Sequence, residues 1–224
     1  MSPAVPLKRL SCPVCLRPLG TCICQWITPT AHQVEVVVLQ HPQEVSHAKG
    51  SARLLHLSLP RSVMACGEVF AEKALQDLIS APLHPQATAH TPSYTILLYP
   101  DSPQDQALGL PAPPALVAGR LREPFQLRLI VLDATWRKSR KMLYLNPLLH
   151  QLPRLTLRNL PPSRYRIRKA HKPDQLSTLE ASCAALAQLE GNAASFAPLL
   201  AAFDGFVAQQ RGYGAAPSRY AKTA

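Results

Sequence analysis

The sequence lacks any long hydrophobic run. Of its 224 residues 47% are hydrophobic, but no uninterrupted apolar stretch approaches the roughly 20 residues that a membrane-spanning helix needs. The first fifteen residues, MSPAVPLKRLSCPVC, also lack the apolar segment that a secretory signal requires. We therefore expect a soluble, cytoplasmic protein without a membrane partner.

Acidic residues are scarce. The chain has 13 Asp and Glu against 24 Lys and Arg, which gives a formal net charge of +11. Such an excess favours polyanionic partners through long-range attraction and counterion release. A basic surface that serves only solubility is the alternative, so the position of the charges has to decide between the two.

Residues 1–30 show no sustained hydrophobic period, yet they contain four closely spaced cysteines in CPVCLRPLGTCIC. In a reducing compartment disulfides are rare, and thiolate ligation of a metal is the natural alternative. Cys12, Cys15, Cys22 and Cys24 suit a closed structural zinc site, with an iron–sulfur cluster as the lesser alternative. Cys66 and Cys183 stand alone, and we expect both to be buried free thiols.

The chain after residue 30 predicts an α/β domain. Continuous apolar runs in VEVVVLQHP, YTILLYP and LRLIVLD are typical of strands buried on both faces, and RLTLRNL suggests a short fourth strand. Helices are expected over 44–59, from a capping box at Ser177 and Glu180, and over 193–210. Strands that alternate with helices indicate a mostly parallel sheet with flanking helices.

The end of the third strand is the candidate site. Ligands bind at the carboxyl ends of parallel strands, where Asp133, Thr135 and Trp136 follow the apolar run LIVL. A structural reading competes with this one. Asp133 could cap a helix or accept backbone hydrogen bonds, and Trp136 could belong to the core.

The motif DATW resembles the DxTW signature of the DTW-domain family. The cysteine cluster, LQHPQE, LLYP and LSTLEA resemble other stretches of that family, in the expected order over roughly residues 12 to 190. The resemblance implies a SPOUT-like fold with a C-terminal trefoil knot. It also divides the chain into a zinc-binding module at 1–30, a DTW catalytic domain at 31–212 and a flexible basic tail at 213–224.

The resemblance further implies a tRNA-uridine aminocarboxypropyltransferase. Such an enzyme moves the 3-amino-3-carboxypropyl group of S-adenosylmethionine to N3 of a tRNA uridine and releases methylthioadenosine. Asp133 is then a general base, an anchor for the donor's amino group or an electrostatic partner of its sulfonium. Thr135 is expected to fix the turn or bind the ligand, and Trp136 to shield the donor's methyl group.

The resemblance assigns the remaining candidate residues to the two substrates. Donor contacts are expected from Leu98, Tyr99, Pro100, Leu132, Leu160, Pro161, Ser177, Thr178 and Glu180. RNA contacts are expected from Arg137, Lys138, Arg164, Arg166, Arg168, Lys169 and Lys172, although a solvated run of charges would look the same.

Two other functions stay open. A SPOUT-class RNA methyltransferase would use the same donor, and a non-catalytic zinc-containing RNA-binding protein would use only the basic surface. We expect no obligate protein partner and favour a monomer, because the cysteine module and the C-terminal helix could cover the surface that a dimer would use.

Overall fold

The computed structural model describes residues 10–83, 92–100, 109–157, 160–165, 167 and 175–215. Its strands are β1 Glu35–Gln40, β2 Ser62–Cys66, β3 Tyr94–Leu98, β4 Leu127–Asp133 and β5 Arg154–Leu155. Its α-helices are α1 Ala52–Ser58, α2 Glu72–Ser80, α4 Trp136–Leu145, α5 Thr178–Glu190 and α6 Ala197–Ala215. The short 3₁₀ turns used below are η2 Cys24–Trp26, η3 Pro42–Glu44 and η6 Pro147–Gln151.

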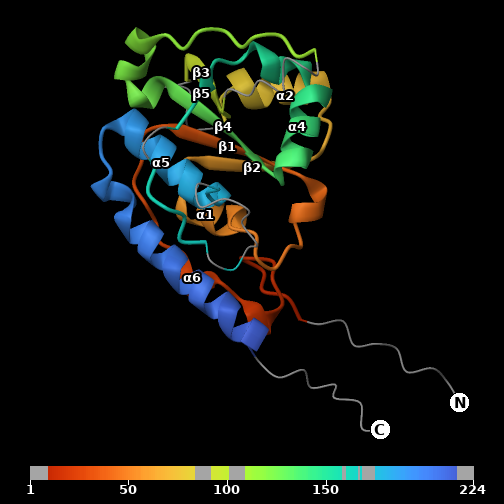
Figure 1. Ribbon diagram of the computed structural model, residues 1–224, viewed down its shortest axis with the longest axis vertical. Coiled ribbons are helices and arrows are strands. Elements are labelled where there is room, and N and C mark those ends of the chain that lie inside the picture. Colours follow the sequence, from red (N-terminus) through yellow and green to blue (C-terminus); the bar gives the residue numbers. More distant parts are fainter. Residues whose placement is uncertain are drawn as a thin grey trace, which may run out of the picture.

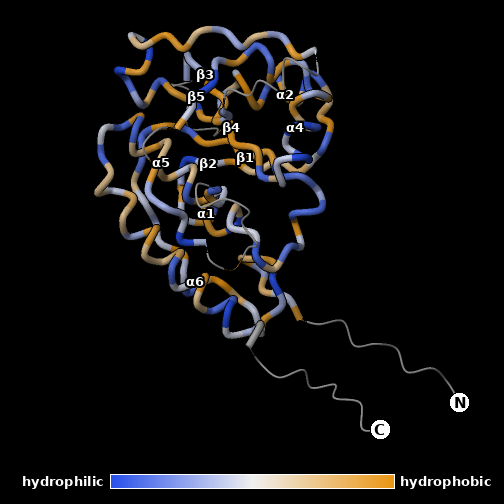
Figure 2. The backbone as a smooth tube through the Cα atoms, viewed as in Figure 1, coloured by the Kyte–Doolittle hydropathy of each residue, from blue (hydrophilic) through white to orange (hydrophobic). Residues whose placement is uncertain are grey.

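The described strands form one parallel sheet in the order β2-β1-β4-β3-β5. Helices α2 and α4 cover one face, and α1 and α5 cover the other, with α6 outside them (Figure 1). Alternate residues of β1 and β4 enter the two core clusters, so both faces of these strands are buried. Figure 2 shows the resulting hydrophobic centre along these strands. The predicted α/β class is confirmed.

A buried ion pair aligns the two central strands at their amino ends. Arg128 of β4 donates to Glu35 of β1 at 2.7 Å, and neither side chain is exposed. The same guanidinium donates to the carbonyls of Leu78 and Ala81, at the end of α2. Arg128 therefore fixes the register between β1 and β4 and attaches α2 to the sheet.

Three predictions about local structure were wrong or incomplete. The helix expected over 44–59 begins only at Ala52, because residues 42–50 form η3 and a tight turn in which Gly50 N–H donates to His47 O. Strand β2 and helix α2 were not predicted. Cys66 is exposed at the end of β2, whereas Cys183 is buried as expected. Burial raises the pKa of the Cys183 thiol to about 12.

The other predicted elements are present, with shorter bounds in places. Strands β1, β3 and β4 and the helices α5 and α6 lie where the sequence indicated, and β5 occupies two residues of RLTLRNL. Within the described residues, no helix is both long enough and apolar enough to cross a membrane. Of the flexible tail expected at 213–224, residues 213–215 instead form the end of α6, and residues 216–224 lie outside the described residues.

The cysteine segment packs on the main core. Cys12, Cys15 and Ile23 are buried in the same cluster as Phe203 and Phe206 of α6. Trp26 of η2 donates its indole N–H to Gln209 of α6. The segment therefore shares the core formed by α5 and α6.

Candidate functional site

Asp133 ends β4 beside Gln40, the last residue of β1, and the two are register partners. The chain leaves β1 toward β2 on one side and leaves β4 toward β5 on the other. Connections that diverge from two neighbouring strands mark a topological switch point, where open α/β sheets bind ligands. The topology therefore places Asp133 where a ligand site is expected.

The carboxylate of Asp133 is buried and held from two sides. Gln40 Nε2–H donates to Oδ2 at 2.8 Å, and Thr178 Oγ1–H donates to Oδ1 at 2.6 Å. Only 6% of Asp133 is exposed. Donors to both oxygens fix the orientation of this carboxylate at the strand end.

Two aromatic rings lie next to each other at this end of the sheet. Trp136, the first residue of α4, packs edge-on against Tyr99 with ring centroids 6.1 Å apart. Trp136 is 50% exposed, so it is not a core residue, whereas Tyr99 is buried. The guanidinium of Arg154 lies over the Tyr99 ring, 5.0 Å from its centroid.

The amino end of α5 supplies Thr178, and its predicted capping box is present. Ser177 accepts from Glu180 N–H, and Glu180 accepts from Ser177 N–H. Glu180 also accepts from Ser163 Oγ–H and Arg164 N–H. Ser177 and Glu180 therefore fix the helix start and the segment 163–164, and Thr178 between them donates to Asp133.

The remaining predicted donor contacts differ in their exposure. Leu98, Pro100, Leu132 and Leu160 are partly buried, and Pro161 is exposed. Thr135 is the N-cap residue of α4, but its side chain makes no capping hydrogen bond. An open pocket of about 440 Å³ lies beside β5 and is lined by Arg154, Leu155, Thr156, Gln188 and residues 113–116. None of the predicted site residues lines it.

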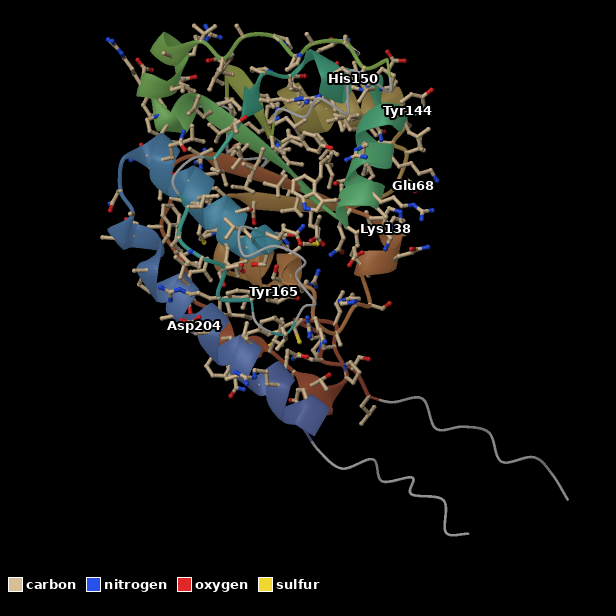
Figure 3. The ribbon with its side chains drawn as sticks, viewed as in Figure 1. Glu68, Lys138, Tyr144, His150, Tyr165 and Asp204 are labelled. Carbon is tan, nitrogen blue, oxygen red and sulfur yellow. The ribbon has the colours of Figure 1, made fainter. Side chains whose placement is uncertain are left out.

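The predicted RNA contacts divide into three groups. Arg137 is exposed on α4. Lys138 forms an ion pair with Glu44 at 2.8 Å, and Arg164 forms one with Asp204 at 2.7 Å. Figure 3 labels Lys138 on α4 and Asp204 on α6. Arg166, Arg168, Lys169 and Lys172 lie outside the described residues.

The four cysteine sulfurs converge as a metal site requires. All lie within 4.8 Å of one another, with Cys12 and Cys24 Sγ 3.5 Å apart and Cys15 and Cys22 Sγ 3.7 Å apart. A tetrahedral zinc with Zn–S bonds of about 2.3 Å separates its sulfurs by about 3.8 Å. The arrangement fits such an ion, and no pair is close enough for a disulfide.

Local backbone geometry forms this thiolate cluster. Leu16 N–H donates to Cys12 O, and Leu16 itself adopts the left-handed conformation with φ 60°. Backbone hydrogen bonds from Cys15 and Val14 lower the pKa of the Cys12 thiol to about 6. The turn therefore stabilises the thiolate of Cys12, whereas burial raises the pKa of the Cys24 thiol to about 12.

A model of the DTW domain matches residues 9–211, from the cysteine segment to the last helix. The chain belongs to the DTW-domain family. In this member, the family signature DATW contributes the buried carboxylate of Asp133 and the exposed ring of Trp136, one at the end of β4 and the other at the start of α4.

Curated relatives of this DTW protein have one activity in their names. The chain is 28% identical over 193 residues to tRNA-uridine aminocarboxypropyltransferase 2 of Mus musculus, covering 83% of this chain and 58% of the relative. The protein of the same name from Drosophila melanogaster is 29% identical, with coverages of 83% and 68%. The tRNA-uridine aminocarboxypropyltransferase A of Arabidopsis thaliana is 32% identical over 142 residues, with coverages of 60% and 50%.

The chain thus spans between half and about two thirds of the length of these relatives. No solved structure matches it significantly.

Three residues near the DTW motif were not predicted. Gln40 holds Asp133, and His41, the next residue, donates its N–H to the Asp133 carbonyl at 3.0 Å. His41 Nδ1 accepts from Gln43 N–H, so its Nε2–H donates to Glu68 at 3.1 Å. Hydrogen bonds from Lys141 and His41 lower the pKa of Glu68. The sequence feature that could have indicated them is a polar pair, Gln40 and His41, directly after an apolar run.

Proposed function

We propose that this DTW protein is a tRNA-uridine aminocarboxypropyltransferase that uses S-adenosylmethionine as donor. The names of its relatives support the reaction. The observation in the structure that carries the proposal is the buried, doubly hydrogen-bonded carboxylate of Asp133 at the switch point of the sheet. A fixed anion there suits a donor that carries a sulfonium and an ammonium group.

The reaction joins N3 of uridine to the γ-carbon of the aminocarboxypropyl group. The bond between that carbon and sulfur breaks, its electron pair leaves with methylthioadenosine, and the N3 proton passes to solvent water. Three carbons on the sulfonium are electrophilic, so the site has to select one of them by orientation. Trp136 and Tyr99 provide an aromatic wall against which the donor's methyl group can rest.

For Asp133 we propose the electrostatic role rather than that of general base. Both carboxylate oxygens already accept strong hydrogen bonds, from Gln40 and Thr178. Those bonds hold the carboxylate in one orientation, as an electrostatic partner of the donor requires. A preorganised anion can orient a cationic donor by electrostatic attraction, without any proton transfer.

We further propose the finer features that accompany this function. Asp133, Thr178 and the backbone around Leu98–Pro100 and Leu160–Pro161 would hold the donor, and the four cysteines would hold a structural zinc ion. The substrate is tRNA, with Arg137, Lys138, Arg164, Arg166, Arg168, Lys169 and Lys172 as candidate contacts.

We also propose a SPOUT-like fold with a C-terminal knot for the catalytic domain at 31–212, with the zinc-binding segment at 1–30 packed on it. The described topology supports the fold, since the chain crosses from β3 to β4 and back to β5, and α5 then packs against β4.

The coproduct tests this function. Purified protein incubated with tRNA and S-adenosylmethionine should release methylthioadenosine, in an amount that depends on the tRNA. Release of S-adenosylhomocysteine would instead identify a methyltransferase. Binding of tRNA without either product would identify a non-catalytic RNA-binding protein.

A further inference from the structure

Helix α4 has one buried face and one exposed face, and the exposed face carries cations and aromatic rings. Ser139, Met142 and Leu143 are buried against the sheet. The helical repeat of 3.6 residues places another set on the solvent side. We call this set the α4 outer face; it comprises the exposed residues Trp136, Arg137, Lys141 and Tyr144.

The two aromatic residues of this face are well exposed. Trp136 is 50% exposed and Tyr144 is 56% exposed, and Figure 3 shows Tyr144 on the side of α4 away from the sheet. The two residues are eight positions apart, which is about 12 Å along a helix. They form two hydrophobic surfaces in water with the cations between them.

The charge of α4 differs from that of an ordinary solvated helix. Helix α2 mixes signs and has an i,i+4 ion pair between Lys73 and Asp77, as exposed helices commonly do. Helix α4 has four cations and no acid in WRKSRKMLYL. Two of its cations lie in the first turn, where the helix dipole disfavours positive charge. Helix stability therefore does not account for this charge, whereas a polyanionic partner would.

Ion pairing separates the cations that face the protein from those that face outward. Lys138 pairs with Glu44, and its side chain is only 27% exposed. Lys141 pairs with Glu68 but remains 58% exposed. Arg137 is exposed and has no ion-pair partner in the part of the chain that the structure describes.

We infer that the α4 outer face binds a single-stranded segment of RNA. Bases stack on Trp136 and Tyr144, and Arg137 and Lys141 contact phosphates between them. Alternating aromatic platforms and cations are the usual means of holding unpaired nucleotides. The inference rests on the proposed function for the identity of the RNA, and it places that strand directly beside the DATW motif.

This assignment changes the predicted set of contacts. Tyr144 and Lys141 join Arg137, while Lys138 and Arg164 serve ion pairs within the protein. Trp136 lies at the boundary between the two proposed substrates, because its ring packs against Tyr99 while half of its surface is exposed.

Affinity measured against salt concentration tests the inference. The probes are an unmodified tRNA transcript and a short uridine-containing single-stranded RNA, with full-length protein. Tyr144→Ala should weaken binding about fivefold or more without changing the salt dependence, because a stacked base is lost. Arg137→Ala should weaken binding and reduce the slope of log affinity against log salt by about 0.7, because one phosphate contact to a single strand is lost.

Conservative and matched variants complete the experiment. Tyr144→Phe should retain the affinity, since stacking needs only the ring. Arg122→Ala removes an exposed cation near the opposite end of β4, and Tyr213→Ala removes an exposed ring on α6. Neither should change affinity more than twofold, and thermal unfolding should show that every variant is folded.

The outcomes separate this inference from the proposed function. If Tyr144→Ala and Arg137→Ala bind both RNAs as the control variants do, the α4 outer face is not the RNA site. The wild-type protein could still release methylthioadenosine, and the proposed function would stand. If the wild type releases none, the proposed function fails, but the affinity comparison still decides this inference.

Discussion

At the scale of single residues, Asp133 carries the proposed chemistry, and its surroundings determine what it can do. The sequence indicated a carboxylate after an apolar strand, and the structure places it at 6% exposure. Its partner Gln40 could not be predicted, because that contact depends on which strand lies beside β4. The order of strands follows from tertiary packing, which local patterns do not encode.

Removing the charge of Asp133 tests its role. Asp133→Asn keeps the size of the side chain but removes the anion, so affinity for S-adenosylmethionine should fall about tenfold or more. Calorimetric titration with the donor alone measures this effect. If donor affinity is unchanged while turnover is lost, Asp133 is the general base instead. Thr178→Val, which removes one of its hydrogen bonds, should have a smaller effect in the same direction.

The pKa of Glu68 predicts a pH dependence of stability. Hydrogen bonds from Lys141 and His41 lower the pKa of this carboxyl below its ordinary value of 4.5. A depressed pKa contributes stability above that ordinary value, and the contribution is lost as pH falls through the folded-state pKa. The melting temperature of the wild type should therefore exceed that of Glu68→Gln at pH 7, and the difference should shrink below pH 4.5. If the difference in melting temperature stayed constant from pH 7 to below pH 4.5, the charged form of Glu68 would not be its cause.

At the scale of elements, α6 and the turn η2 pack unusually closely. A Cβ added at Gly205 of α6 would lie well inside contact distance of the Trp26 ring. Gly205→Ala should therefore destabilise the fold by about 1 to 3 kcal/mol through overpacking, as measured by denaturant unfolding.

Gly212 of the same helix provides the control for this prediction. A Cβ there meets nothing within 4 Å, so Gly212→Ala should be neutral or stabilise by up to about 1 kcal/mol through helix propensity. Equal effects of the two substitutions would contradict the packing of Trp26 on α6.

The success of sequence patterns differed between central and peripheral elements. β1, β3 and β4 were predicted because both of their faces are buried, which yields continuous apolar runs. The edge strand β2 is only partly buried, so SVMAC has no clear pattern. Over 44–51 the apolar spacing was helical by coincidence, and Val45 is 56% exposed. Capping chemistry located α5 correctly because it depends only on neighbouring residues.

At the scale of the whole molecule, the cysteine segment is connected to the body at several points. Arg17 donates to the carbonyls of Ala48 and Gly50 and lies over the Phe206 ring, 5.2 Å from its centroid. Ser51, next in the chain, accepts from Leu179 N–H at the start of α5. The cysteine cluster is therefore linked through one turn to the helix that holds Asp133.

Metal removal should consequently affect the entire fold. Chelation, or Cys15→Ser, should lower the melting temperature in a single cooperative transition, because Cys12 and Cys15 belong to the main core. Calorimetry with zinc content measured in parallel checks this. Melting of a separate low-temperature unit, with the main transition unchanged, would show instead that residues 1–30 are an independent module.

The central claim is that the aminocarboxypropyl group, and not the methyl group, reaches the RNA. The most direct measurement uses two preparations of S-adenosylmethionine, one labelled in the aminocarboxypropyl chain and one in the methyl group, each incubated with protein and tRNA. The proposal predicts that only the chain label enters the tRNA, while the methyl label stays with the small-molecule product. Methyl label in the tRNA, or no label in it from either preparation, would contradict the proposal.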